Sequence, residues 1–328
     1  MNKCSIIFLG ILVTICYGRE PIKPFHGAVP YMVYYTSRYR GICVGTLVHQ
    51  TVVLTAAVCV CNPRSLIPDT QPINVVTGTS YRHPRRGVRV QITKILKPKM
   101  PTDLSRRAHE LQISPALLLM KRKIPDVLTE VPLRALDIDW MSEESLNLQE
   151  ECMMIGWHFF YKNDKIFPVS KFLLQRNIRV QFLNVVRMHA WCDVLSIKLE
   201  KSLANLGYEG ELDKSNMICV RDPDQAAQPC HGSYGSPLVC RGRVVGVMVS
   251  PDGQWTNCTG QSNIIHRFNT SPISNFMKCV SGMFSSEMRS NGEEMKKALY
   301  DEMDEYDYLP ALYGRVVAVD GESSSDEI

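Results

Sequence analysis

The chain lacks an excess of charge of either sign, internal repeats, and long apolar runs beyond its N-terminus. Its 37 basic and 33 acidic residues leave a net charge of only +4, and 21% of its 328 residues are charged. Together with 45% hydrophobic residues, this composition excludes a disordered, collagen-like or coiled-coil protein and is typical of a globular one. At about 150 residues per domain, the length predicts one large or two smaller domains.

The one extended apolar stretch is Ile6–Ile15, which follows Lys3 and precedes Cys16-Tyr17-Gly18. A charged start, a short apolar core and small residues at a cleavage point are typical of a secretory signal. A membrane anchor is the alternative, but a spanning helix needs ~20 apolar residues and no run here is that long. We therefore predict a signal peptide over residues 1–18, a secreted extracellular protein and no membrane span.

Cysteine is abundant, with twelve residues in the chain. Signal cleavage would remove Cys4 and Cys16, and an even ten in an oxidising compartment predicts five disulfides. Zinc binding is the alternative, but Cys59-Val60-Cys61 is too closely spaced for the usual ligand pair and no CxxC pair follows. We therefore expect no metal and no cofactor. The ten cysteines are Cys43, Cys59, Cys61, Cys152, Cys192, Cys219, Cys230, Cys240, Cys258 and Cys279.

Two short sequons are candidates for N-glycosylation, at Asn257 and Asn269. Such triplets also arise by chance, so an unmodified asparagine is the alternative at each position. Glycosylation at either position would fit a secreted chain.

Short β-branched or aromatic runs separated by turn residues occupy the chain from about residue 30 to residue 280. This spacing predicts antiparallel β-structure in barrels or sandwiches. The segment Thr270–Met283 has apolar residues at helical spacing, which predicts a terminal helix. The runs are Tyr31–Tyr35, Thr51–Leu54, Ile73–Val76, Val88–Ile92, Ile178–Phe182 and Val244–Val249.

The composition changes after Ser281. Residues 281–328 contain 12 acidic and four basic residues, a net charge of −8, so the rest of the chain carries +12. The small total charge is therefore a cancellation between a basic body and an acidic tail.

Several segments, with cysteines in register, carry a family resemblance: CVGTL at Cys43–Leu47, LTAAVC at Leu54–Cys59, CMMIGW at Cys152–Trp157 and CHGSYGSPLVC at Cys230–Cys240. PYMV at Pro30–Val33 and NMIC at Asn216–Cys219 add two further matches. In this order they resemble the signature segments of the chymotrypsin/trypsin serine protease family over residues 27–280. The resemblance implies an all-β domain over residues 19–280, with two six-stranded antiparallel β-barrels and a C-terminal helix, followed by an acidic, disordered tail over 281–328.

The family needs a serine nucleophile, a histidine base and an aspartate that orients the histidine. At the matching positions this chain has Tyr234, Val58 and Ser114. Asp103 and Glu110 lie near the aspartate position but not at it. The resemblance therefore implies a catalytically inactive homologue. A hydrolase with a displaced nucleophile is the alternative; a tyrosine has a pKa of ~10 and would need a base that valine does not provide.

Two further family features are missing. No Ile-Val-Gly-Gly-like segment for zymogen activation precedes Pro30, and Ser233 occupies the position of the aspartate that would pair with the freed terminus. In the substrate-binding strand, Ser-Pro-Asp beginning at Ser250 replaces Ser-Trp-Gly, and the specificity position is Gln228. These departures predict a cleft that no longer pairs with a peptide substrate.

The resemblance also implies four disulfides: Cys43–Cys59, Cys152–Cys240, Cys192–Cys219 and Cys230–Cys258. Cys61 and Cys279 fit no common family bridge, and we predict that they pair with each other; an intermolecular bond through one of them is the alternative. The loop between Cys192 and Cys219 is enlarged by a surface insertion over Lys198–Asp213.

Basic clusters predict a face that binds heparin-like glycans or an acidic partner. The alternative is an ordinary solvated surface. The tail segment Tyr300–Tyr308 interleaves tyrosine with acid and resembles sulfated docking tails, with Tyr306 and Tyr308 as candidate sulfation sites. It could instead be a disordered solvating tail, or fold back and mask the basic face. The candidate anion-binding residues are Arg82, Arg85, Arg86, Arg89, Lys121, Arg122 and Lys123.

The resemblance thus implies a secreted serine protease homologue that works by binding another secreted protein, such as a protease or cascade component, as cofactor, decoy or scaffold. By analogy with the family we expect a role in reproductive (seminal) fluid. No clip-type cysteine module precedes Cys43, which disfavours a cofactor of a melanisation cascade. The alternatives are an immune or clotting cascade regulator, a glycan-binding module and the displaced-nucleophile hydrolase. Nucleic acid is not an expected partner of a secreted chain.

Overall fold

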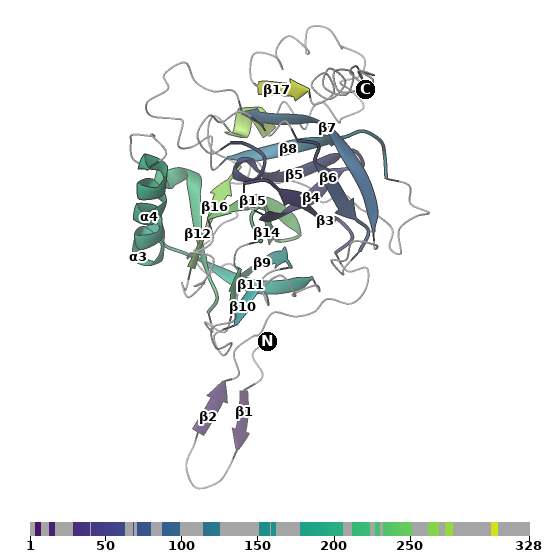
Figure 1. Cartoon of the computed structure of the whole chain (residues 1–328). Helices are drawn as coiled ribbons and strands as arrows, with labels where there is room; N and C mark the ends of the chain where they lie inside the picture. The colour runs from purple at the N-terminus through teal and green to yellow at the C-terminus, as the bar shows by residue number, and fades with distance from the viewer. Residues whose placement is uncertain are drawn as a thin grey trace, which may run out of the picture.

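The structure is a computed structural model, and Figure 1 shows two β-barrels that form the body of the molecule. It describes residues 4–7, 13–16, 29–39, 41–62, 68, 71–79, 87–98, 114–124, 151–157, 159–161, 178–205, 212–223, 227–229, 232–250, 262–268, 273–277 and 303–307.

The first barrel contains six antiparallel strands in the order β7-β6-β3-β4-β5-β8, and pairing between β7 and β8 closes it. Its strands are rich in valine, isoleucine and leucine, and β5 and β8 are buried almost throughout. That pattern is typical of strands whose two faces are both covered. The bounds are β3 Met32–Ser37, β4 Gly41–His49, β5 Val52–Ala56, β6 Asn74–Thr77, β7 Val88–Pro98 and β8 Pro115–Met120.

The second barrel is also closed and six-stranded, in the order β11-β12-β16-β15-β14-β9. Every neighbouring pair is antiparallel. The predicted all-β fold with two six-stranded barrels is therefore confirmed. The bounds are β9 Glu151–Gly156, β11 Arg179–Val186, β12 Met217–Arg221, β14 Pro237–Cys240, β15 Arg243–Ser250 and β16 Ser262–Arg267.

Helices are few among the described residues. The η1 turn (Ala57–Cys59) follows β5, the η3 turn (Lys214–Asn216) precedes β12, and residues 273–277 form part of the predicted terminal helix. Helices α3 (Met188–Trp191) and α4 (Asp193–Ala204) lie beside β12 in Figure 1. The first residues of the predicted surface insertion are thus helical. None of the helices in the described part of the chain has the length and apolar character to cross a membrane.

Two small two-stranded sheets form no hydrogen-bonded pairing with the described strands of either barrel. Strands β1 (Cys4–Ile7) and β2 (Val13–Cys16) form a hairpin that pairs with no other described strand. Strands β10 (Phe159–Tyr161) and β13 (Ala227–Pro229) also pair only with each other. The signal peptide over residues 1–18 stays a prediction.

The described residues of the acidic tail form strand β17 (Met303–Asp307), which pairs antiparallel with β7 at the edge of the first barrel (Figure 1). These five residues form a strand, and the expectation of a disordered tail over residues 281–328 stays a prediction. The physical reason for the strand is that β7 is longer than its neighbour β6 and carries an edge on which another strand can pair.

Candidate functional site

The position of the family histidine is held by the η1 turn. Strand β5 runs directly into this turn, and all three of its residues, including Val58, are buried. The N–H of Ala57 donates to the carbonyl of Ser114 at 2.7 Å. This bond holds the residue that precedes β8 against the turn, so the positions of the histidine and the aspartate lie together.

The position of the family serine lies on the loop before β14. The N–H of Val44 donates to the carbonyl of Tyr234 at 2.9 Å, and the N–H of Gly235 donates to the carbonyl of Met248 at 2.9 Å. Gly235 has a φ of 81°, and a Cβ at this position would collide with the Val44 carbonyl and with Thr55 Oγ1. Only glycine fits this close approach, which places the loop of the second barrel directly against strands β4 and β5.

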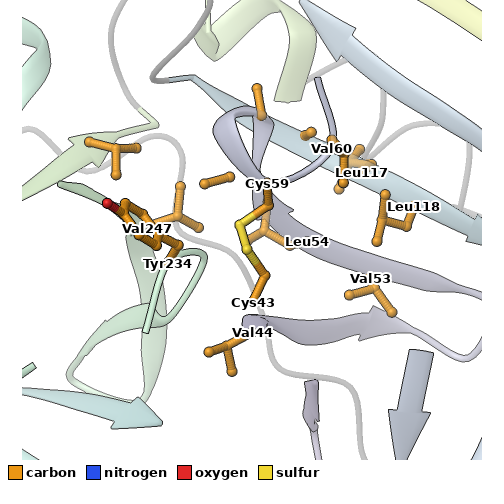
Figure 2. Close-up of a cluster of buried hydrophobic side chains, with 14 of the residues drawn as sticks. Cys43, Val44, Val53, Leu54, Cys59, Val60, Leu117, Leu118, Tyr234 and Val247 are labelled. Atoms are coloured by element: carbon orange, nitrogen blue, oxygen red, sulfur yellow. A yellow bond between two sulfur atoms is a disulfide. The ribbon is translucent and has the colours of Figure 1, made fainter. Parts of the chain in front are cut away.

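Ser114 thus lies against the turn that carries Val58, and Tyr234 lies against β4, whose Cys43 is bonded to Cys59 of the same turn. Val58, Ser114 and Tyr234 are all buried, with exposed fractions of 5%, 0% and 7%. Val58 and Tyr234 belong to one apolar cluster, and Figure 2 shows Tyr234 with Val247 and the Cys43–Cys59 bridge.

The chemistry available at these positions differs from that of a serine hydrolase. A valine side chain neither donates nor accepts a proton. The Ser114 hydroxyl donates to the Pro115 carbonyl at 3.3 Å and carries no charge to orient a base. Ser114 and Tyr234 each keep a hydroxyl, and Tyr234 belongs to the apolar cluster.

The neighbouring family positions are placed only in part. Ser233 is fully buried. Gln228 lies on β13 opposite Phe160, and β15 has a register irregularity against β16 that ends at Ser250. Asp103, Glu110, Pro251 and Asp252 lie outside the described residues.

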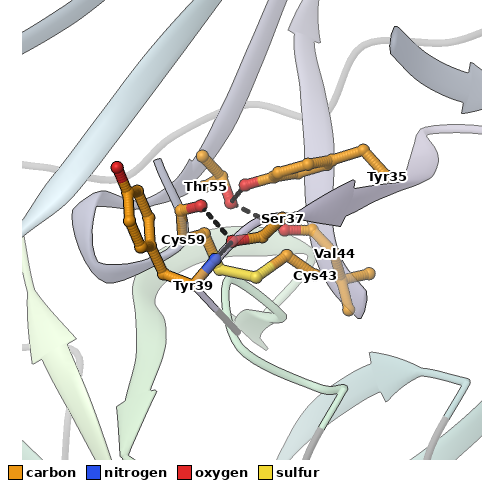
Figure 3. The surroundings of a disulfide bond; sticks show 7 residues. All are labelled: Tyr35, Ser37, Tyr39, Cys43, Val44, Thr55 and Cys59. Carbon is orange, nitrogen blue, oxygen red and sulfur yellow. Dashed lines mark hydrogen bonds between the residues drawn. A yellow bond between two sulfur atoms is a disulfide. The ribbon is translucent and has the colours of Figure 1, made fainter. Parts of the chain in front are cut away.

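A disulfide anchors the turn that carries Val58. Cys43 of β4 is bonded to Cys59 of η1, and the Ser37 hydroxyl donates to the Cys59 carbonyl at 2.6 Å (Figure 3). The Tyr39 N–H donates in turn to the Ser37 oxygen at 3.1 Å. Backbone and side-chain bonds therefore fix the turn on both sides.

A second buried network lies next to the turn. Thr55 Oγ1 donates to the Val44 carbonyl at 2.7 Å, so its single proton is used. The 2.7 Å bond between Tyr35 and Thr55 must then have the tyrosine hydroxyl as donor (Figure 3). Burial raises the pKa of Tyr35, which keeps this donor protonated.

The structure contains two further disulfides that the resemblance implies, Cys152–Cys240 and Cys192–Cys219. Cys61 is buried directly after η1, and its backbone forms an isolated antiparallel β-bridge with Pro68. Its predicted partner Cys279, and the pair Cys230 and Cys258, lie outside the described residues; their pairings stay predictions.

Part of the predicted anion-binding surface comes together on the first barrel. Arg89 on β7 is exposed, and so are Lys121, Arg122 and Lys123 after β8. The N–H of Lys121 donates to the carbonyl of Gln91 at 2.9 Å, which brings the two segments side by side. We call these four residues the basic patch.

Other candidate residues are only partly described. Tyr306 lies on β17, opposite Ile95. The candidates outside the described residues are Arg82, Arg85, Arg86, Asn257, Asn269 and Tyr308. Within the described part of the chain, no group of three or more His, Cys, Asp or Glu side chains could hold a metal ion.

His266 on β16 is a buried titratable group that sequence reasoning missed. Burial lowers its pKa to about 4, against the opposing effects of the Arg267 carbonyl and the charge of Asp213. Its Nδ1–H donates to the Arg267 carbonyl at 2.9 Å, and its Nε2 has no hydrogen-bond partner among the described residues. A sequence run of Asn-Ile-Ile-His-Arg gives no signal for such burial, because only the barrel decides which face His266 occupies.

Comparisons with known proteins agree with the fold. A family model described as Trypsin matches residues 22–271. Granzyme M of Rattus norvegicus is 24% identical over 276 residues, which cover 82% of this chain and 89% of granzyme M. Human heparin binding protein has a similar structure with a TM-score of 0.53 at 18% identity, over 80% of this chain and 94% of that one. The scabies mite inactivated protease paralogue S-D1 has a TM-score of 0.54 at 17% identity, over 80% and 97% of the two chains.

Proposed function

The chain belongs to the trypsin family, and we propose that it acts there without catalysis, by binding other secreted molecules. The observation that carries this proposal is the set of residues at the triad positions. Val58, Ser114 and Tyr234 occupy the positions that the resemblance assigns to the histidine, aspartate and serine.

The loss of all three groups removes proton transfer, orientation of the base and the usual nucleophile at once. Loss of one triad member already costs several orders of magnitude in rate, and further losses add little because the group acts as a unit. Ser233 offers no carboxylate to pair with a freed terminus. These positions thus lack both the triad groups that peptide hydrolysis needs and the carboxylate that zymogen activation needs.

Val58 and Tyr234 are buried in one apolar cluster, so in this proposal they stabilise the packing of the barrels instead of contacting a substrate. The scabies mite relative is described as an inactivated protease paralogue, which supports non-catalytic use of the same fold. The predicted signal peptide and the three disulfides support secretion.

The role that follows is that of a cofactor, decoy or scaffold for another extracellular protein. A place in reproductive (seminal) fluid is the biological setting that we propose, and regulation of an immune or clotting cascade is the alternative. Both share the requirement that the folded domain binds a partner without cleaving it.

The test is labelling of the folded protein with a fluorophosphonate probe, together with hydrolysis of a mixed peptide library. We expect neither labelling nor cleavage, while active trypsin serves as the positive control. Labelling that is lost in Tyr234→Phe would overturn the proposal, because it would identify the phenol as a working nucleophile.

Anionic glycans are a second candidate ligand, and the exposed basic patch favours them. One solved structure with this fold is named human heparin binding protein. We expect retention on heparin resin above about 0.15 M salt, since several converging cations are needed for that.

A matched pair of variants tests this candidate. The substitutions K121E/R122E/K123E should abolish retention, while K201E/R241E/R243E changes the same charge at exposed positions elsewhere. Equal loss in both variants would mean that only net charge matters, and would remove the basic patch as a site.

A further inference from the structure

Strand β7 (Val88–Pro98) extends beyond the residues that pair with its neighbour β6. Its residues 88–91 pair with β6, and its residues 92–96 pair with β8 on the opposite edge. A strand has only two edges, so the five residues Lys94–Pro98 that pair with β17 use the edge that β6 has left. The tail strand thus extends the row that β6 begins.

Charge follows the register of this pairing. Asp307 is directly opposite Lys94, and Asp304 is directly opposite Lys97. Residues opposite each other in an antiparallel pair share a face of the sheet and interact most strongly with each other. Two of the five pairs therefore join an acid with a base.

The two ends of the edge fit the same interpretation. Lys97 is only 2% exposed, and lysine is almost never buried without a counter-charge. Pro98 closes the strand opposite Met303, and proline within a sheet is confined to edges and ends. The edge is therefore suited to one short strand that carries acidic residues at fixed positions.

We propose that the Lys94–Pro98 edge is a docking site for an extended acidic segment of a partner protein, and that Met303–Asp307 occupies it in cis. This inference rests on the proposed binding function for its biological use, and it names the partner chemistry and its regulation. Strand addition supplies affinity through main-chain hydrogen bonds, and the two lysines select for acid.

The tail then regulates its own site. A tethered segment competes at an effective concentration in the millimolar range, so a partner strand binds only when it is presented at high local concentration or when the tail is released. Raised salt weakens the lysine–carboxylate attraction and so favours release. The acidic tail would set a threshold for partner binding.

The first experiment compares hydrogen–deuterium exchange in three full-length proteins: wild type, D304K/D307K, and the control E293K/E294K. The control makes the same charge change in the tail but outside β17. Reversing two opposed pairs should weaken docking about tenfold. We expect alternate amides of residues 94–98, those facing β17, to exchange about tenfold faster in D304K/D307K alone, with residues 88–91 unchanged.

The second experiment measures binding of a labelled peptide with the sequence of residues 300–308 by fluorescence anisotropy. The D304K/D307K protein should bind it about tenfold more tightly than the other two proteins, because its cis competitor is weakened. Combining Lys94→Glu with Asp307→Lys should restore slow exchange, because the opposed pair regains opposite charges.

Equal exchange of residues 94–98 in all three proteins would overturn the proposal. So would altered exchange without peptide binding, because the edge would then accept only its own tail. A mass of two chains by light scattering would assign β17 to a second copy and overturn the cis arrangement. Fluorophosphonate labelling would instead overturn the non-catalytic function and leave the exchange result unaffected, so the two failures are distinguishable.

Discussion

The two barrels have the same number of strands, but their shortest ladders are supported differently. In the first barrel, β3 and β6 share a single register pair, Tyr34 with Val76, and neither strand contains a cysteine. In the second, β9 and β14 share two register pairs, and the Cys152–Cys240 bond lies next to them. A covalent link therefore supports the shortest ladder of the second barrel but not that of the first.

Their interiors differ as well. In the first barrel the buried Tyr35 and Thr55 form a continuous donor–acceptor chain that ends at the Val44 carbonyl. In the second, His266 is buried with one ring nitrogen that no described residue bonds. The first barrel thus contains a buried donor–acceptor chain, while the second contains a disulfide beside its shortest ladder and a buried group sensitive to pH.

Removing the Cys152–Cys240 disulfide should have the largest effect on this contrast. Cys152–Cys240 spans 88 residues and Cys43–Cys59 spans 16. Loop entropy predicts a loss of about 4–5 kcal/mol of unfolding free energy for C152A/C240A and about 3 kcal/mol for C43A/C59A. Denaturant titration without reductant measures both; an equal or larger loss in C43A/C59A would contradict the role of the long bridge.

The junction between the barrels should respond next. Gly235 and Gly242 both have φ near +80°, but a Cβ at Gly235 would collide with β4 and β5, whereas Gly242 has open space around it. We expect Gly242→Ala to cost about 1 kcal/mol from backbone strain, and Gly235→Ala about 3 kcal/mol because collision is added. Thermal unfolding of the two variants separates these terms, and similar losses would show that the close approach does not matter.

The second barrel alone should lose stability in mild acid. The pKa of His266 is about 4 in the folded state and about 6.5 in the unfolded state, so the unfolded chain takes up the proton first as the pH falls. Stability should therefore drop by about 2 kcal/mol between pH 7 and pH 5, and continue to fall until about pH 4.

The matched variant for this effect is His266→Gln, which keeps a side chain of similar polarity without titration. Its free energy of unfolding, measured by urea titration at several pH values, should lack the extra slope between pH 6.5 and pH 4. Parallel pH profiles of the two proteins would count against His266 as the responsible group.

The smallest expected effect is in the first barrel. Tyr35→Phe removes one buried donor but leaves the bond from Thr55 to Val44 intact, so the loss should be about 1 kcal/mol. Thr55→Val removes both bonds and leaves two buried groups unsatisfied, and should cost about 2–3 kcal/mol. If the two substitutions cost the same in denaturant titration, the chain of bonds is not cooperative.

Much of this architecture could be predicted from sequence, because the residue pattern of a barrel strand is a local property of the chain. The runs at Val88–Ile92 and Val244–Val249 became strands, with ends extended by pairing that a single segment does not reveal. Helix α4 was missed, although Leu195, Leu199 and Leu203 repeat at a spacing of four. The charged and serine residues between these leucines made the helical spacing less evident than the β-strand pattern of the rest of the chain.

The candidate site shows the same division. Val58 and Tyr234 could be assigned from short segments that end in or contain cysteine, and Ser114 from the apolar stretch Ile113–Leu118. How these residues are held in the fold depends on Gly235 and on the bond between Ala57 and Ser114. These contacts join residues far apart in the chain, and no local pattern encodes them.

By itself, the sequence determined which chemical groups stand at the triad positions, which cysteines are available for bonding, and how charge divides between body and tail. Residue identity and spacing are local properties, so they can be read without coordinates. Only the tertiary structure decided that β7 extends beyond β6, that Asp304 and Asp307 lie opposite Lys97 and Lys94, and that His266 is buried. Register, edge exposure and burial arise from the pairing of distant segments. This pairing makes residues 303–307 of the acidic tail a strand.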